Sequence, residues 1–201
     1  MKSKMNVPNT LSLIRALLVP VFVATLLYMR EIPIWCCVVP TVVYILTGLT
    51  DMLDGKIARK RGLVTDFGKF MDPLADKFMV IAAMMCIMYR SHSTPLVFNI
   101  LMPLILITVF RELAVTSIRL IAVKNANIVV PANMLGKIKT VSQIVFVMSV
   151  LLEPELAKIG FLSFLSYYPI TVISAAVVLV MTVWSGIVYL KTYWKYLDKN
   201  M

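Results

Sequence analysis

Four aspartates stand at helical spacing on either side of a short basic stretch. Asp51 and Asp54 are three residues apart, and Asp72 and Asp76 are four apart. On helices both spacings put the two side chains on one face, and a short connector would bring the two pairs together. Four neighbouring carboxylates repel one another unless cations lie between them, and Mg²⁺ binds carboxylate oxygens together with substrate phosphates. The pattern predicts a site for two divalent cations, Mg²⁺ or Mn²⁺, that clamps a phosphoryl group.

The residues between the two pairs suit a pyrophosphate ligand. Gly55 lets a ligand approach the backbone, Ala58 is small, and Gly68 lies one helical turn before Asp72. Arg59 can offer a forked contact to phosphate or ribose oxygens. The stretch is therefore expected to bind a metal-bound pyrophosphate at the membrane interface.

An alternative is a solvated loop whose acids cap two helices. Asp72-Pro73 resembles an N-cap followed by proline at the first helical position. Capping does not explain Asp51 and Asp54 after an apolar run, or Asp76 a turn into the next one. Ionisable groups inside spanning segments are costly and usually functional, which favours the metal site.

The elements that must position these residues are long and apolar. The chain has 201 residues, of which 60% are hydrophobic and only 15% charged, with a mean hydropathy of +0.89. A soluble domain would have about a quarter charged residues, and a spanning helix needs about 20 apolar ones. We expect one all-α integral membrane domain over 1–201. Its six transmembrane helices are expected at 10–28, from 33 into the charged stretch, from after 68 to 89, and at 95–123, 135–152 and 169–193. The segment 153–158 is expected to be an outer loop or a short interfacial helix.

The basic residues predict the orientation. Those at the two termini and in the connectors after the second and fourth segments are Lys2, Lys4, Lys56, Arg59, Lys60, Arg61, Lys69, Lys124, Lys137, Lys139, Lys191, Lys195 and Lys199. The other side has only Arg30, Arg90 and Lys158. Cytoplasmic loops are enriched in Lys and Arg. Both termini and the active site should therefore lie on the cytoplasmic side of the cell membrane. The net charge of +10 then indicates anionic head groups and phosphates, not nucleic acid.

The aspartate stretch resembles the CDP-alcohol phosphotransferase family. The full motif of that family is matched by Asp51-x-x-Asp54-Gly55-x-x-Ala58-Arg59, eight residues, Gly68, three residues, Asp72, three residues and Asp76. The resemblance implies six transmembrane helices, usually in a homodimer, with two divalent metals on the four aspartates. It implies that Asp76 removes the proton from the acceptor alcohol. The residues it implies for the CDP group of the donor are Gly55, Ala58, Arg59 and Gly68, to which Thr65 would add a hydroxyl contact.

Further charges inside apolar segments are candidates for binding the acceptor. Arg111 and Arg119 are eight residues apart, about two helical turns, and Lys137 and Lys139 open the fifth segment. Such a set suits a doubly charged phosphate monoester, and Glu112 could orient one arginine or receive a substrate hydroxyl. The alternative is that the lysines follow the positive-inside rule and the arginines extend to the interface.

Three stretches are similar to bacterial phosphatidylglycerophosphate synthases: NVPNTLSLIRALLVPVF at 6–22, REL followed by SIR at 111–119, and GKIKT at 136–140. This resemblance implies an enzyme of phospholipid synthesis that transfers the phosphatidyl group of CDP-diacylglycerol to sn-glycerol 3-phosphate and releases CMP. Alternative acceptors are phosphatidylglycerol, as in a cardiolipin synthase of this type, and inositol phosphate. A different alternative is a non-catalytic transporter whose acidic cluster is a cation pathway.

Overall fold

The computed structural model describes residues 7–28, 35, 37–47, 66–126 and 134–197, with the backbone alone at 7–13, 15–16, 66–76, 119–126 and 195–197. These residues are helical apart from short turns, and none of them forms a strand. The elements are α1 (Val7–Tyr28), the helical segment Cys37–Thr47, α3 (Asp66–Arg90), η2 (Ser91–Ser93), α4 (Pro95–Ala126), α5 (Met134–Leu156), η3 (Gly160–Tyr167) and α6 (Pro169–Leu197). The all-α prediction is confirmed over this part of the chain.

The apolar segments predict the ends of α1, α3, α4, α5 and α6 to within a few residues. The ends of the second segment, predicted from 33 into the charged stretch, lie outside the described residues. Pro95 opens α4 and Pro169 opens α6, as proline at a first helical position should. Among the described residues, the helices long and apolar enough to cross a membrane are Pro95–Ile118, Met134–Leu156 and Pro169–Trp194. Shorter apolar helices cover Leu17–Tyr28 and Cys37–Thr47.

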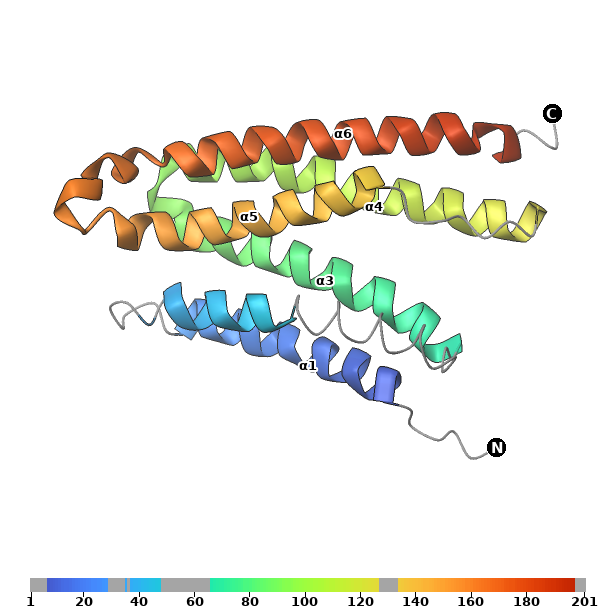
Figure 1. The fold of residues 1–201 in the computed structure, drawn as a ribbon, viewed down its shortest axis with the longest axis horizontal. Helices are drawn as coiled ribbons and strands as arrows, with labels where there is room; N and C mark the ends of the chain where they lie inside the picture. The colour runs from blue at the N-terminus through green and yellow to red at the C-terminus, as the bar shows by residue number, and fades with distance from the viewer. Residues whose placement is uncertain (1–6, 29–34, 36, 48–65, 127–133, 198–201) are drawn as a thin grey trace. The chain divides into compact units, whose positions relative to one another are not determined.

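The described elements fall into two units, Met1–Arg90 and Ser91–Met201. In the first unit α1 packs against α3, and the rings of Phe22 and Tyr44 lie with their centroids 5.6 Å apart. In the second unit α6 packs along both α4 and α5 (Figure 1). Helix α6 is therefore the element against which both other long helices of the second unit pack.

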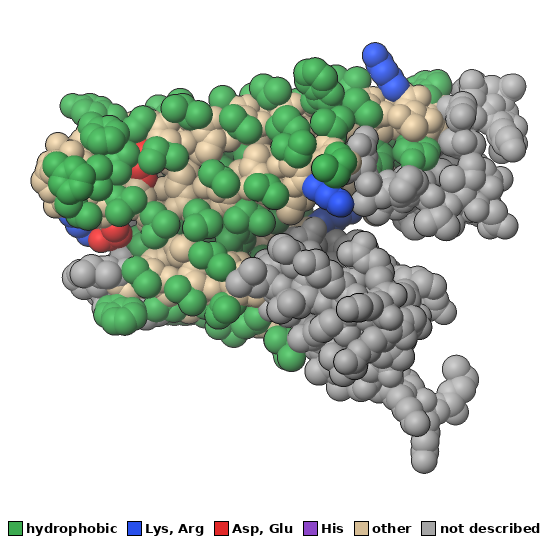
Figure 2. All heavy atoms as spheres, in the orientation of Figure 1, with side chains coloured by type: hydrophobic (Ala, Val, Ile, Leu, Met, Phe, Trp, Pro, Cys, Tyr) green, Lys and Arg blue, Asp and Glu red, His purple; other side chains and the backbone are tan. Residues whose placement is uncertain are grey.

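The buried face of α6 is a stripe of mostly small side chains at intervals of three or four residues. Its members are Thr171, Ser174, Ala175, Val178, Thr182, Ser185, Gly186 and the larger Tyr189. Small residues let neighbouring helices approach closely, which gains van der Waals contact in a lipid environment. Exposed positions such as Ile173, Val180 and Trp184 are large and apolar, and Figure 2 shows hydrophobic side chains along the length of these helices. This surface is suited to lipid contact.

Contacts between side chains show how the three helices run. Glu112, late in α4, pairs with Lys139, early in α5. Ser149, late in α5, lies 3.0 Å from Ser174, early in α6. The C-terminal halves of α4 and α6 and the N-terminal half of α5 therefore lie at the same end of the unit. Lys158 follows α5 at the opposite end.

The connection between α5 and α6 is held by a buried carboxylate. Because α5 continues through Pro154 to Leu156, the predicted loop or interfacial helix at 153–158 is wrong for most of its length. Glu153 is 1% exposed and accepts hydrogen bonds from the backbone N–H of Ile170 at 2.8 Å and of Thr171 at 2.9 Å. The Thr171 hydroxyl donates to it as well, at 2.7 Å. Glu153 thus satisfies N–H groups that have no partner inside α6, where a negative charge also complements the helix dipole.

Glu153→Ala should lower the free energy of unfolding by about 2–4 kcal/mol, because it leaves several buried donors without an acceptor. Glu153→Gln should cost less, since its amide oxygen can still accept a hydrogen bond. Thermal unfolding of the detergent-solubilised protein measures both effects. Glu155→Gln is the matched control, because Glu155 pairs with the mostly exposed Lys158 and such pairs contribute little. Equal stability of Glu153→Ala and the wild type would contradict the capping role.

Candidate active site

Part of the aspartate motif lies on a described helix. Asp72 is the seventh residue of α3, which begins at Asp66. The alternative in which Asp72 is the N-cap is therefore wrong. Gly68, Asp72 and Asp76 follow one another at four-residue intervals, which places the three positions on one face of α3.

The other predicted residues of the motif lie outside the described residues: Asp51, Asp54, Gly55, Ala58, Arg59 and Thr65. Only the backbone of α3 is described at Gly68, Asp72 and Asp76. Within the described part of the chain, no group of three or more His, Cys, Asp or Glu side chains could hold a metal ion. None of the predicted ligands belongs to that searched set, so the metal site stays a prediction.

A charge cluster joins α4, α5 and α6, and consists of Arg111, Glu112, Lys139 and Ser185. Glu112 Oε1 accepts a hydrogen bond from Arg111 Nη1 at 3.0 Å and forms an ion pair with Lys139 Nζ. Arg111 Nη2 donates to Ser185 Oγ at 3.0 Å. Glu112 and Lys139 are 8% and 5% exposed. The structure therefore brings together two predicted acceptor ligands, Arg111 and Lys139, and uses Glu112 to bridge them.

Helix α6 fixes the position of Arg111. The guanidinium carbon lies 5.7 Å from the centroid of the Tyr189 ring, within the range of a cation–π contact. A Cβ added at Gly186 would lie 3.3 Å from Arg111 Cγ, so the glycine leaves room for the arginine side chain. Sequence reasoning missed Ser185, Gly186 and Tyr189, for which the only available signal was their spacing on one face of α6.

The two lysines of the GKIKT stretch have different surroundings. Lys139 is buried against Glu112, whereas Lys137 is exposed. Two residues correspond to about 200° around a helix, so the two side chains leave α5 in nearly opposite directions. Arg119 lies on the backbone of α4, two turns after Arg111, and its side chain is outside the described set. The structure thus groups two of the four predicted acceptor ligands and separates Lys137 from them.

The charge cluster has the composition of an anion site. Its described members carry two cations and one carboxylate, and Arg111 is 11% exposed over its side chain. Arg111 Nε is buried and has no hydrogen-bond partner among the described residues. The Nη atoms hold the guanidinium in place, and its Nε–H can still donate a hydrogen bond to a phosphate oxygen.

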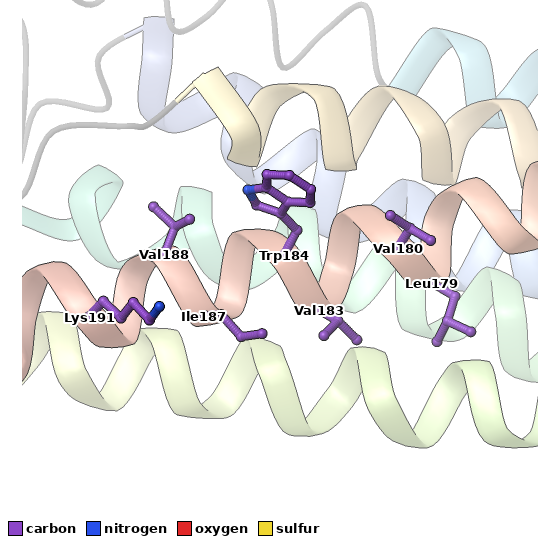
Figure 3. Close-up of a pocket in the computed structure, with 7 residues that line it drawn as sticks. All are labelled: Leu179, Val180, Val183, Trp184, Ile187, Val188 and Lys191. Carbon is purple, nitrogen blue, oxygen red and sulfur yellow. The ribbon is translucent and has the colours of Figure 1, made fainter.

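A pocket of 590 Å³ opens along α6 and has a different character (Figure 3). Its lining residues are Leu179, Val180, Val183, Trp184, Ile187, Val188 and Lys191. Lys191 is the only charged group among them, and the remaining side chains are apolar. Because this lining offers no side-chain oxygen for a metal and only one cation for a phosphate, the pocket is not the candidate active site. The candidates are the aspartate motif of the first unit and the charge cluster of the second, each taken by itself.

Comparison with known proteins covers nearly the whole chain. Residues 5–188 match the family model described as CDP-alcohol phosphatidyltransferase. The chain is 35% identical to a CDP-diacylglycerol–glycerol-3-phosphate 3-phosphatidyltransferase of Bacillus subtilis strain 168, over 97% of this chain and 95% of the relative. It is 31% identical to the protein of the same name from Yersinia enterocolitica, over 96% and 97% of the two chains. A relative of that name from Haemophilus influenzae is 38% identical over 58% of each chain.

Proposed function

Because the chain belongs to the CDP-alcohol phosphatidyltransferase family, we propose that it is an enzyme that transfers the phosphatidyl group of CDP-diacylglycerol to sn-glycerol 3-phosphate. The products are phosphatidylglycerophosphate and CMP. The observation that carries this proposal is the similarity, over 97% of the chain, to a relative named for the reaction. The reaction would need the carboxylates of the intact aspartate motif. It would also need the buried cations of α4 and α5.

The metal-binding residues of this proposal are the four aspartates, Asp51, Asp54, Asp72 and Asp76. Their fit to a divalent cation is supported by α3, on which Asp72 and Asp76 stand one turn apart, and by the preference of Mg²⁺ and Mn²⁺ for carboxylate oxygens. Two such cations, when bound, would neutralise the charge of the donor pyrophosphate. Contacts to the CDP group would come from Gly55, Ala58, Arg59, Thr65 and Gly68.

Asp76 is proposed as the general base. Its carboxylate would accept the proton of the 1-hydroxyl of glycerol 3-phosphate. The oxygen would then attack the β-phosphorus of CDP-diacylglycerol, the bond from that phosphorus to the CMP oxygen would break, and CMP would leave. Asp76 would thus perform proton transfer in addition to holding a metal.

The acceptor phosphate is proposed to bind the cations of α4 and α5. Arg111 is already oriented by Glu112, Ser185 and Tyr189, so little side-chain entropy would remain to be lost on binding. Lys139 lies in the same cluster. Arg119 would complete the phosphate site from the cytoplasmic end of α4. Lys137, which leaves α5 on the side away from Lys139, would contact the acceptor phosphate from outside the charge cluster.

The membrane arrangement proposed for the enzyme has six spans in one catalytic domain, with both termini and the active site at the cytoplasmic face of the cell membrane. This arrangement is supported by the second unit, where Lys124 at the end of α4, Lys137 at the start of α5 and Lys191 near the end of α6 belong to the same end. That clustering agrees with the positive-inside rule. A homodimer is proposed from the family resemblance.

The purified enzyme tests the function through CMP release from CDP-diacylglycerol with a panel of acceptors. Release should depend on glycerol 3-phosphate. Release that depends on phosphatidylglycerol or on inositol phosphate would reassign the acceptor within the family. Absence of release with every acceptor, together with cation uptake into protein-containing vesicles, would indicate the transporter instead.

Lys137→Ala should raise the KM for glycerol 3-phosphate about 10- to 100-fold, because a lost charged hydrogen bond to phosphate costs roughly 1.5–3 kcal/mol. Arg119→Ala should have the same effect, and Arg119→Lys should restore little if the contact is bidentate. The KM for the donor should not change in either variant.

Lys158→Ala is the matched control for the acceptor series, because Lys158 follows α5 at the opposite end of the unit. Its acceptor KM should equal that of the wild type. A normal acceptor KM in both Lys137→Ala and Arg119→Ala would make these residues interfacial charges, and phosphatidylglycerol would be the first alternative acceptor to assay.

A further inference from the structure

Besides Arg111 Nε of the charge cluster, three uncharged polar side chains on α4, α5 and α6 contain buried atoms without a hydrogen-bond partner among the described residues. Thr108 Oγ1, Gln143 Nε2 and Thr182 Oγ1 are buried and have no hydrogen-bond partner among the described residues. The three residues are 1%, 1% and 0% exposed. Buried polar atoms are almost always hydrogen-bonded, because leaving one unpaired in an apolar region costs free energy. Each of the three helices contributes one of these three uncharged groups.

The register of α4 and α5 puts the first two side chains at one level. The ion pair between Glu112 and Lys139 joins these antiparallel helices. Thr108 is four residues before Glu112, and Gln143 is four residues after Lys139. Since four residues make about one helical turn, Thr108 and Gln143 lie at about the same level along the two helices, one turn from the ion pair and on the same side of it.

The register of α4 and α6 adds the third side chain. The hydrogen bond between Arg111 and Ser185 joins these parallel helices. Thr108 is three residues before Arg111, and Thr182 is three residues before Ser185. The same displacement along both helices keeps the two threonines at one level. Thr108, Gln143 and Thr182 therefore form a polar layer next to the charge cluster.

We propose that this polar layer binds a buried water molecule. A buried water typically makes about three hydrogen bonds to groups that would otherwise be unsatisfied, and the layer supplies one group from each helix. The hydroxyl groups of Thr108 and Thr182 can donate or accept, whereas Gln143 Nε2 can only donate. A buried amide nitrogen that can only donate disfavours a metal cation, and the absence of a charge on all three side chains disfavours an anion.

The water has a physical role beside the charge cluster. It places a reorientable dipole one helical turn from the ion pair of Glu112 and Lys139, where lipid and apolar side chains would otherwise surround these charges. A nearby water lowers the desolvation cost of a buried pair. This role concerns the packing of the second unit and is independent of the proposed reaction.

Variants that keep the side-chain shape test the proposal through the melting temperature. Loss of a water site should lower it, whereas a dry layer should leave it unchanged or raise it. Thr108→Val and Thr182→Val keep the shape of the side chain and remove the hydroxyl. If a water links the three helices, each variant should lower the melting temperature of the solubilised enzyme by about 2–4 °C. The double variant should lose less than the sum of the two, because both single variants disrupt the same site. Thr192→Val is the control: Thr192 is exposed and its hydroxyl bonds to Val188 O of its own helix at 2.8 Å, so its melting temperature should not change.

An experimental density map of the wild-type enzyme, at a resolution that shows ordered water, completes the test. A solvent peak within hydrogen-bonding distance of all three side chains would support the proposal. Unchanged or raised melting temperatures in both threonine variants would show a dry layer and overturn it. Lowered melting temperatures without a solvent peak would assign the coupling to direct side-chain hydrogen bonds, which also overturns it.

Discussion

Asp72→Asn should abolish CMP release with every acceptor alcohol. An amide replaces one carboxylate oxygen by a nitrogen that cannot bind a cation and removes the negative charge that neutralises it. The loss of turnover should exceed the roughly 10- to 100-fold effect of changing a residue that only supports a metal ligand. The measurement is CMP release over a range of Mg²⁺ and Mn²⁺ concentrations, in which Asp72→Asn should show no activity even at saturating cation.

The same assay contains its controls. Glu155→Gln removes a carboxylate far from the motif in the sequence and should retain full turnover. Asp76→Asn should bind cation and CDP-diacylglycerol but not turn over, if Asp76 acts mainly as the base. A loss of donor binding equal to that of Asp72→Asn would make Asp76 primarily a metal ligand. Full activity of the wild type after treatment with a chelator would contradict the metal site itself.

Glu112→Ala should destabilise the enzyme by about 3–5 kcal/mol. The substitution leaves the guanidinium of Arg111 and the ammonium of Lys139 buried without the carboxylate that they share. Breaking a buried ion pair from one side is costly, because the remaining charges lose this partner in a region that bulk water does not reach. The free energy of unfolding in mixed detergent micelles measures the loss. The KM for glycerol 3-phosphate should rise in the same variant, since Arg111 loses one of its orienting contacts.

Removing both members of the Glu112–Lys139 ion pair distinguishes the loss of the charge interaction from the loss of packing. Glu112→Gln combined with Lys139→Met removes both charges and should be more stable than Glu112→Ala, although it changes more atoms. Glu112→Gln alone should fall between Glu112→Ala and the wild type, because its amide oxygen can still accept a hydrogen bond. A Glu112→Ala variant as stable as the wild type would mean that the cluster is hydrated and contributes no ion-pair energy.

Local patterns in the sequence determined the helices and the reaction class. Apolar runs of about 20 residues and prolines at their starts are short-range features, and they placed the first residues of α4 and α6 at Pro95 and Pro169. The spacing of Asp72 and Asp76 required only that α3 be helical, which it is. The motif with its fixed spacings identified the family before any contact was known.

Only the tertiary structure decided which polar side chains meet. The sequence treats Lys137 and Lys139 alike, but the rotation of α5 buries Lys139 against Glu112 and leaves Lys137 exposed. The sequence also gives no sign that Ser185 on α6 contacts Arg111, a residue 74 positions earlier. The predicted outer loop or interfacial helix at 153–158 was wrong for most of its length for the same reason, because the donors that satisfy Glu153 lie on another helix. A helix forms from interactions within a few residues, whereas its rotation and register depend on packing against neighbours that are distant in the chain.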